Sequence, residues 1–140
     1  MSLLRNAHAP NATPAVIADA LLHEAIHSLL FIYEEIAGPF VASDKLAQEA
    51  QIVSPWSGRA LPLQQFTHAC LVWYGLYWFW TTARARGTWP DEHSRPLAAR
   101  ARAGFDKHPL AAIPTACRAH LSAEIADTLA IVEARMGANH

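Results

Sequence analysis

The sequence predicts a mainly α-helical fold, a single domain of about four helices with a metal site between two long buried helices. Long apolar segments alternate with breaks rich in proline and glycine, and strand-like patterns are scarce outside residues 41 to 53. Two histidines stand one helical turn apart in the first long segment. A chain of 140 residues fits one domain and is long enough to bury a core.

The first helix is expected from residue 14 to about residue 36. Residues 1 to 13 are predicted to form a flexible lead-in, and Thr13 followed by Pro14 is typical of an N-cap with proline in the first turn. The Gly-Pro pair at positions 38 and 39 should end the helix. Because apolar residues occur on more than one of its sides, we expect this helix at the centre of the core.

Two connecting segments follow. Residues 40 to 52 are predicted to form a short helix or loop over the site, and residues 53 to 62 an irregular loop dense in turn-forming residues. The second segment contains Ser54, Trp56 and Arg59 between prolines, a composition more typical of a binding loop than of a linker.

A second long helix is expected from residue 63 to about residue 86. Its uninterrupted apolar part, residues 69 to 80, is 12 residues long, whereas crossing a bilayer takes about 20. We therefore predict a buried core helix and no membrane partner.

Two further helices are expected, one over residues 94 to 105 with Ser94 as the cap and a last one from residue 114 to about residue 136. The single domain, 1–140, would then consist of a metal-site core at 14–86 and a C-terminal helical pair at 94–137.

The net charge of −1, with eight histidines counted as neutral, gives no field that would recruit nucleic acid or an anionic membrane. Cys70 and Cys117 stand far apart in apolar runs, so we expect buried free thiols. No apolar signal core occurs near the N-terminus, which favours the cytoplasm. A solvated helical face is predicted for the late cluster of Arg84, Arg86, Arg95, Arg100 and Arg102.

The chemistry is predicted from the segment Leu22-His23-Glu24-Ala25-Ile26-His27, a His-Glu-x-x-His motif. In a helix, His23 and His27 share one face and can bind one metal ion. Glu24 beside them can ligate, act as a base or orient a water. A metal would relieve the cost of burying these polar groups. The structural alternative is a non-catalytic helical binding module with ordinary histidines.

A zinc hydrolase would use Zn²⁺, a third ligand, an open position for water and Glu24 as general base. Glu49 is the candidate ligand at the spacing of one protease branch, whereas Glu34 and Glu35 follow the motif too closely. The branch with a third histidine is excluded, because a tyrosine occupies position 33.

An iron(II) oxygenase would need three facial protein ligands and three free positions for a 2-oxo acid and dioxygen. His68 is the strongest third ligand, because it is a polar residue among apolar neighbours at the start of the second long helix. Its alternative role is a core histidine bonded to a backbone carbonyl. The far carboxylate of the oxo acid needs a cation or hydroxyls, and Arg59 and Ser54 are nearby in sequence.

The chain combines the His-Glu-x-x-His motif, the segments Ser54-Pro55-Trp56 and Pro62-Leu63, and His68 before an aromatic helix. In this combination of motifs it resembles the HExxH-type peptide-modification proteins. That family is described as 2-oxoglutarate- and Fe(II)-dependent peptide β-hydroxylases, often encoded with ribosomally made peptides. The matching region covers about residues 20 to 82. The family usually has basic residues after the Ser-Pro-Trp and before the Pro-Leu segments, where this chain has a serine and a leucine.

The resemblance implies that His23, His27 and His68 bind Fe(II), with 2-oxoglutarate as co-substrate. Glu24 would hold a histidine or the bound water. The candidate cofactor-binding residues are Arg59, Ser54 and Trp56. Only 22 residues precede the motif, fewer than is usual in the family. We therefore expect a peptide or small-molecule substrate, with a recognition partner protein or a homodimer as candidate assemblies.

Overall fold

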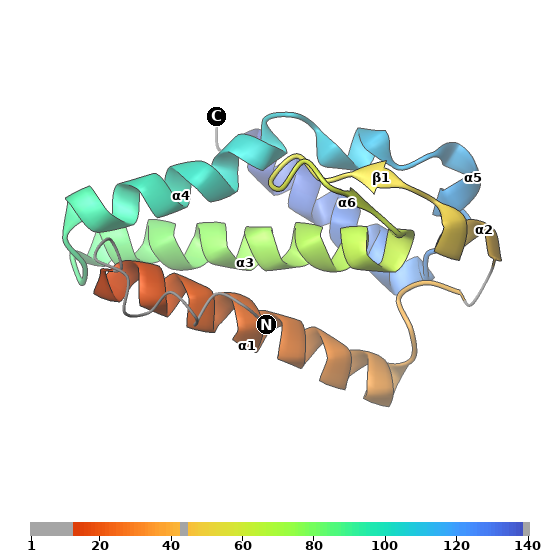
Figure 1. Ribbon diagram of the computed structural model, residues 1–140, viewed down its shortest axis with the longest axis horizontal. Coiled ribbons are helices and arrows are strands. Elements are labelled where there is room, and N and C mark those ends of the chain that lie inside the picture. The colour runs from red at the N-terminus through yellow and green to blue at the C-terminus, as the bar shows by residue number, and fades with distance from the viewer. Residues whose placement is uncertain (1–12, 43–44, 139–140) are drawn as a thin grey trace.

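The helix α3 (Leu63–Arg86) forms the axis of the fold, and the other helices pack around it (Figure 1). The structure is a computed structural model that describes residues 13–42 and 45–138. Phe66, Leu76 and Trp80 of α3 have no exposed surface. The predictions of a mainly helical fold and of a buried second helix are therefore confirmed.

The helix α1 (Pro14–Ala37) lies along one side of α3 (Figure 1). Its predicted cap is confirmed, because the Thr13 hydroxyl accepts a hydrogen bond from the Val16 N–H at 3.2 Å. The rest of the expected lead-in lies outside the described residues. Among the described helices, α1 alone is long and apolar enough to span a membrane, by length and composition only.

The expectation that α1 lies at the centre of the core is wrong. Only Ala15 and Ala20 of α1 are buried. Apolar residues occur on several faces of α1. The helix packs against the other helices with one face only, so the apolar side chains on its other faces stay exposed. The exposed large apolar side chains of α1 are Val16, Leu21, Leu29, Phe31, Ile32, Tyr33 and Ile36.

The segment between the long helices contains α2 (Lys45–Glu49) and an antiparallel hairpin of β1 (Ile52–Val53) and β2 (Ala60–Leu61). The loop expected over residues 53 to 62 is thus partly regular. The sequence does not reveal these strands, because two residues are too few to show an alternation of apolar and polar side chains. The turn is closed by the Ser54 N–H, which donates to the Arg59 carbonyl at 2.8 Å. The hairpin and α1 lie on opposite sides of α3 (Figure 1).

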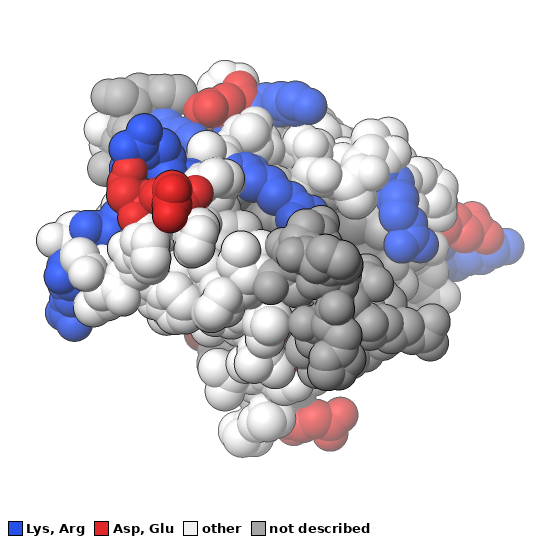
Figure 2. Space-filling model, turned by 60° about the vertical axis from the view of Figure 1, so that its left-hand side comes forward, with Lys and Arg blue, Asp and Glu red and all other residues white. Residues whose placement is uncertain are grey.

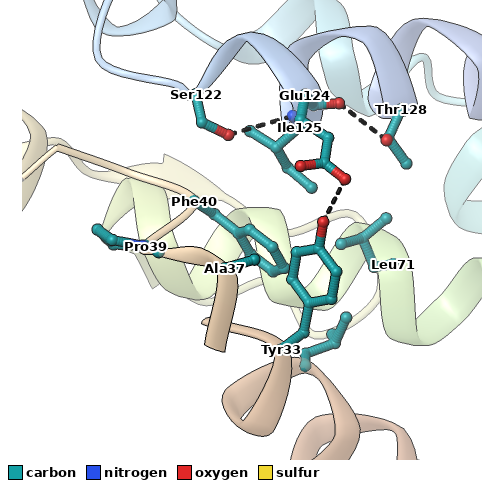
Figure 3. Close-up of a pocket in the computed structure, with 11 residues that line it drawn as sticks. Tyr33, Ala37, Pro39, Phe40, Leu71, Ser122, Glu124, Ile125 and Thr128 are labelled. Carbon is teal, nitrogen blue, oxygen red and sulfur yellow. Dashed lines mark hydrogen bonds between the residues drawn. The ribbon is translucent and has the colours of Figure 1, made fainter. Parts of the chain in front are cut away.

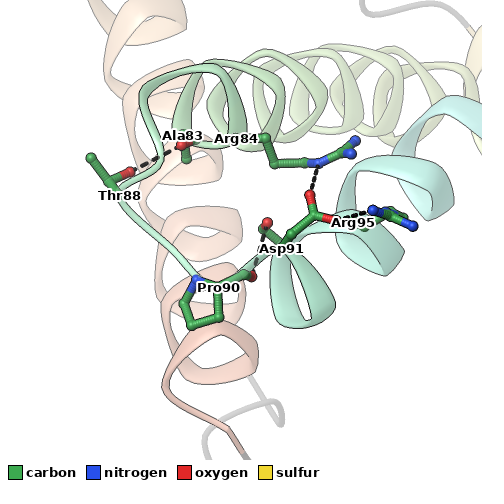
Figure 4. Close-up of polar contacts among 7 residues, drawn as sticks. Ala83, Arg84, Thr88, Pro90, Asp91 and Arg95 are labelled. Carbon is green, nitrogen blue, oxygen red and sulfur yellow. Dashed lines mark hydrogen bonds and ion pairs between the residues drawn. The ribbon is translucent and has the colours of Figure 1, made fainter.

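A tight turn connects α3 to α4 (Asp91–Phe105), which returns along α3. Gly87 ends α3 with a φ of 66°, in the left-handed region that glycine adopts without strain. The Asp91 carboxylate accepts a hydrogen bond from Arg84 at 3.0 Å and also pairs with Arg95 (Figure 4). These charges join the end of α3 to the first turn of α4.

The start of α4 differs from the prediction. Ser94 is not its cap but lies inside the helix, where its buried hydroxyl donates to the Pro90 carbonyl at 3.2 Å. Two acidic residues in the first turn, Asp91 and Glu92, favour the earlier start through the helix dipole.

The C-terminal region contains a 3₁₀ helix (Pro109–Ala112), α5 (Thr115–Arg118) and α6 (Ala123–Ala138). The single helix predicted over residues 114 to 136 is therefore wrong, because the backbone between α5 and α6 pairs with another segment. The Ser122 N–H donates to the Phe40 carbonyl at 2.8 Å, and the Ala42 N–H donates to the His120 carbonyl at 2.7 Å. Long-range pairing of this kind gives no local signal in the sequence.

The prediction of buried free thiols is confirmed, whereas the predicted solvated arginine face holds only in part, because the Arg102 side chain is 16% exposed. Figure 2 shows basic side chains spread over the face with acidic ones among them, and not gathered in one patch. Arg84 and Arg95 share Asp91 as a partner, and Arg100 is exposed. Cys70 and Cys117 are both buried and free.

Candidate metal centre

The structure brings the three predicted metal-binding histidines together between α1 and α3. The ring centroids of His23 and His27 are 5.0 Å apart, as expected one turn apart on one helix face. The ring centroids of His27 and His68 are 5.8 Å apart. With metal–nitrogen bonds of about 2.1 Å, imidazoles that share one ion have centroids roughly 5 Å apart. The His23–His27 pair thus stands at the spacing that a shared ion requires, and the His27–His68 pair is somewhat wider.

The rings do not yet have the orientation of ligands. Within the described parts of the chain, no group of three or more His, Cys, Asp or Glu side chains is arranged to hold a metal ion. The rings of His27 and His68 are stacked with an interplanar angle of 16°. To direct nitrogens from both rings at one point, at least one ring must rotate about its side-chain torsions.

His23 and His27 are half-buried and form no hydrogen bond with any other described group. Partial burial lowers the pKa of His23, opposed by the Glu24 carboxylate and aided by the charge of Arg100. Burial also lowers the pKa of His27, and the neighbouring charges of His23 and His68 act in the same direction. Both shifts favour the neutral imidazole, which is the form that binds metals.

His68 is the most deeply buried of the three, with 3% of its side chain exposed. Its Nε2 is hydrogen-bonded to a carboxylate oxygen of Glu34, while its Nδ1 is buried with no partner in the described structure. The rings of Phe31 and Phe40 lie 4.7 Å and 5.5 Å from the His68 ring, centroid to centroid. Apolar rings on two sides leave few ways to satisfy Nδ1 within the chain.

Glu34 is the site residue that the sequence reasoning missed. Its distance from the motif is too short for the glutamate ligand of a zinc protease. A different signal was present, since seven residues from His27 is about two helical turns, which places Glu34 on the same face of α1.

Aromatic side chains lie on one side of the three histidines. Trp73 of α3 meets the His23 ring edge to face, with centroids 5.9 Å apart. Trp56 stacks on Trp73 at 5.6 Å, and its Nε1 donates to the Ala101 carbonyl at 3.0 Å. Trp56 is therefore one ring removed from the nearest histidine and also holds the hairpin to α4.

The remaining predicted residues lie further from the histidines. Ser54 is buried, and its hydroxyl accepts a hydrogen bond from the Trp56 N–H at 3.3 Å inside the hairpin turn. Arg59 is exposed in the same turn, and α3 lies between this hairpin and α1 (Figure 1). Glu49, the ligand considered for zinc, is exposed in α2 with an oxygen 3.8 Å from the Lys45 ammonium.

A different arginine acts on the site. The Arg100 guanidinium of α4 lies over the Trp73 ring, with its central carbon 4.9 Å from the ring centroid. The Arg100 charge lowers the pKa of His23. Burial raises the pKa of Asp19, one turn earlier on α1, and the Arg100 charge partly offsets this rise. The positively charged side chain of Arg100 thus lies near His23, one of the predicted ligands.

A cavity of about 300 Å³ lies between the end of α1 and the start of α6 (Figure 3). The Tyr33 hydroxyl donates a hydrogen bond to the Glu124 carboxylate at its edge, which raises the pKa of Tyr33. Phe40 lines the cavity and also packs against His68. The described lining contains no lysine or arginine, so the cavity suits an apolar group better than an anionic oxo acid. Its other lining residues are Leu30, Ala37, Gly38, Pro39, Leu71, Ser122, Ile125 and Thr128.

No family model matches this chain, and no curated protein or solved structure matches it either.

Proposed function

We propose that this protein is an Fe(II)- and 2-oxoglutarate-dependent oxygenase that hydroxylates a C–H bond of a peptide or small molecule. The observation that carries the proposal is the approach of His68, from α3, to within 5.8 Å of His27, centroid to centroid. A three-histidine set would leave three of six iron positions for the oxo acid and dioxygen. The resemblance of the sequence motifs to the HExxH-type peptide-modification proteins supports the same chemistry.

The side chains present fit a metal ion of this class. Imidazole nitrogen is a suitable ligand for iron, and both motif histidines are free of other hydrogen bonds within the described structure. The unpartnered Nδ1 of His68 is a buried polar atom of the kind that a bound ion satisfies. Bound iron and oxo acid would supply the oxidising chemistry.

The chain's own side chains would bind, orient and exclude water. Trp73 covers His23, and Phe40 separates His68 from the neighbouring cavity. Glu24 is half-buried beside both motif histidines, where its carboxylate can orient a bound water. We favour Arg100 over Arg59 for the far carboxylate of the oxo acid, because the Arg100 guanidinium lies over the Trp73 ring that contacts His23.

The test is anaerobic reconstitution with Fe(II), followed by measurement of bound iron and of 2-oxoglutarate conversion to succinate. We expect the wild-type protein to bind iron and turn over 2-oxoglutarate, and His68→Ala to lose both. His93→Ala, a substitution on α4 outside the site, is the matched control and should retain both. Circular dichroism would verify that each variant is folded.

Two results would contradict the proposal. The first is a wild-type protein that binds no iron under these conditions, and the second is full iron binding by folded His68→Ala. Peptide cleavage that Zn²⁺ restores after chelation would support instead the hydrolase with Glu24 as base. Absence of binding to any divalent metal would support the non-catalytic helical module.

A further inference from the structure

Glu34 lies near the end of α1 and directs its carboxylate toward α3. Its side chain is 10% exposed. One carboxylate oxygen, Oε1, is hydrogen-bonded to Nε2 of His68. The other, Oε2, accepts hydrogen bonds from the Phe40 N–H at 3.3 Å and from Nε2 of Gln64 at 3.2 Å. Both carboxylate oxygens are therefore hydrogen-bonded, and Oε2 accepts from two N–H groups.

This arrangement assigns the ring proton of His68. The Glu34 carboxylate already accepts two N–H groups at Oε2, so we assign it as the acceptor toward His68 as well. Nε2 of His68 is then the donor to Oε1, and the neutral imidazole keeps its lone pair on Nδ1. The same Nδ1 is the buried atom without a hydrogen-bond partner in the described structure. A buried lone pair of this kind is costly unless it binds something.

We propose that Glu34 and His68 form a carboxylate–imidazole pair that presents Nδ1 of His68 to a divalent metal ion. Metal-binding histidines commonly donate their other ring N–H to a carboxylate, which fixes the tautomer and strengthens the ligand. Glu34 acts here as a positioning residue and does not itself touch the ion. The inference rests on the proposed function, because it uses the same metal site, and it adds the binding atom and the residue that selects it.

The connection to Phe40 gives the pair a second structural role. Glu34 receives the N–H of Phe40, whose ring packs on His68 and lines the adjacent cavity. Loss of the Glu34 carboxylate would therefore remove two hydrogen bonds, the one that fixes the position of the His68 ring proton and the one that holds the loop after α1. A test must separate these two effects.

Co²⁺ is a suitable probe, because its absorption reports binding directly and needs no enzymatic activity. We expect Glu34→Gln to bind Co²⁺ about 10- to 100-fold more weakly than the wild-type protein in competition with a chelator. Glu35→Gln is the matched control, because the neighbouring Glu35 is exposed and should leave the affinity unchanged. Equal affinity in folded Glu34→Gln would overturn the positioning role while the metal site itself stands. No Co²⁺ binding by the wild-type protein would overturn the proposed function together with this inference.

The ring nitrogens of His68 give a second measurement that needs no substitution. Nitrogen-15 NMR of the metal-free wild-type protein should show a protonated Nε2 and an unprotonated Nδ1. Zn²⁺, which is diamagnetic, should shift the Nδ1 resonance most. The opposite tautomer, or a Zn²⁺-dependent change at Nε2 alone, would overturn the inference even where Glu34→Gln does not fold.

Discussion

The indole ring of Trp56 lies parallel to that of Trp73, with centroids 5.6 Å apart and an interplanar angle of 6°. Trp56 comes from the hairpin turn and Trp73 from the middle of α3, so the stack fixes the hairpin to the core. The Trp56 ring also lies against the backbone of α4 at Gly104, where a Cβ atom would overlap the indole. The Ser-Pro-Trp segment therefore has a structural role beside any role in the site.

Gly104→Ala should destabilise the fold by about 1–3 kcal/mol, because the added methyl group must displace the Trp56 ring. Urea denaturation monitored by tryptophan fluorescence would measure the change. Gly137→Ala is the matched control, since no atom lies within 4 Å of the Cβ that would be added there. A Gly104→Ala variant as stable as Gly137→Ala would show that the Trp56 contact is dispensable.

Arg100→Gln should raise the KM for 2-oxoglutarate about 10- to 100-fold if Arg100 binds the far carboxylate, since a charged hydrogen bond contributes about 1.5–3 kcal/mol. Arg59→Gln, in the turn beyond α3, should change this KM little. Steady-state succinate formation by both variants measures the difference. The reverse order of the two KM values would assign the oxo acid to Arg59.

Asp91→Asn should lower the melting temperature at neutral pH and have a smaller effect in acid. Hydrogen bonding to Arg84 is the main cause that lowers the pKa of Asp91, followed on the favourable side by Arg95. The ionised carboxylate therefore stabilises the fold above the usual aspartate pKa of about 3.9, and this contribution is lost as the pH falls through the lower folded-state pKa.

Melting curves of Asp91→Asn and wild type between pH 7 and pH 2.5 would test this dependence. Asp127→Asn, on the exposed side of α6, serves as the control for removing one charge. A difference between Asp91→Asn and wild type that stays constant over the whole pH range would contradict the assigned ion pairs.

Cys70 should resist alkylation in the native protein. Burial raises the pKa of its thiol to about 12, so the reactive thiolate is scarce at neutral pH and access is blocked as well. Mass spectrometry after iodoacetamide treatment should find Cys70 unmodified in buffer and modified in guanidinium. Rapid native modification would mean that α3 opens far more often than its burial implies.

Much of the fold could be predicted because local signals mark its helices. Thr13 and Pro14 begin α1, and Gly87 ends α3. What the sequence did not reveal depends on contacts between distant segments. The break before α6 arises from pairing with residues 40–42, and the exposure of α1 depends on how few partners surround it.

The site shows the same division. His23 and His27 could be found because one helical turn is a local relation, and His68 because a histidine is unusual in an apolar helix. Arg100 could not be found, because only the return of α4 along α3 brings it near His23. Glu34 lay within reach of a helix-face argument, but its buried hydrogen bond to His68 exists only in the folded arrangement.

The weak burial of α1 has a consequence for how the site forms. A helix with two buried side chains among its described residues should open locally at a small free-energy cost, well before α3 unfolds. An ion that binds His23 and His27 of α1 together with His68 of α3 would disfavour this local opening, because the ion binds only when α1 is packed against α3. Amide hydrogen exchange in α1 should therefore be fast in the metal-free protein and slow once metal is added, with little change in α3. The undocked helix would make assembly of the site a metal-dependent last step of folding.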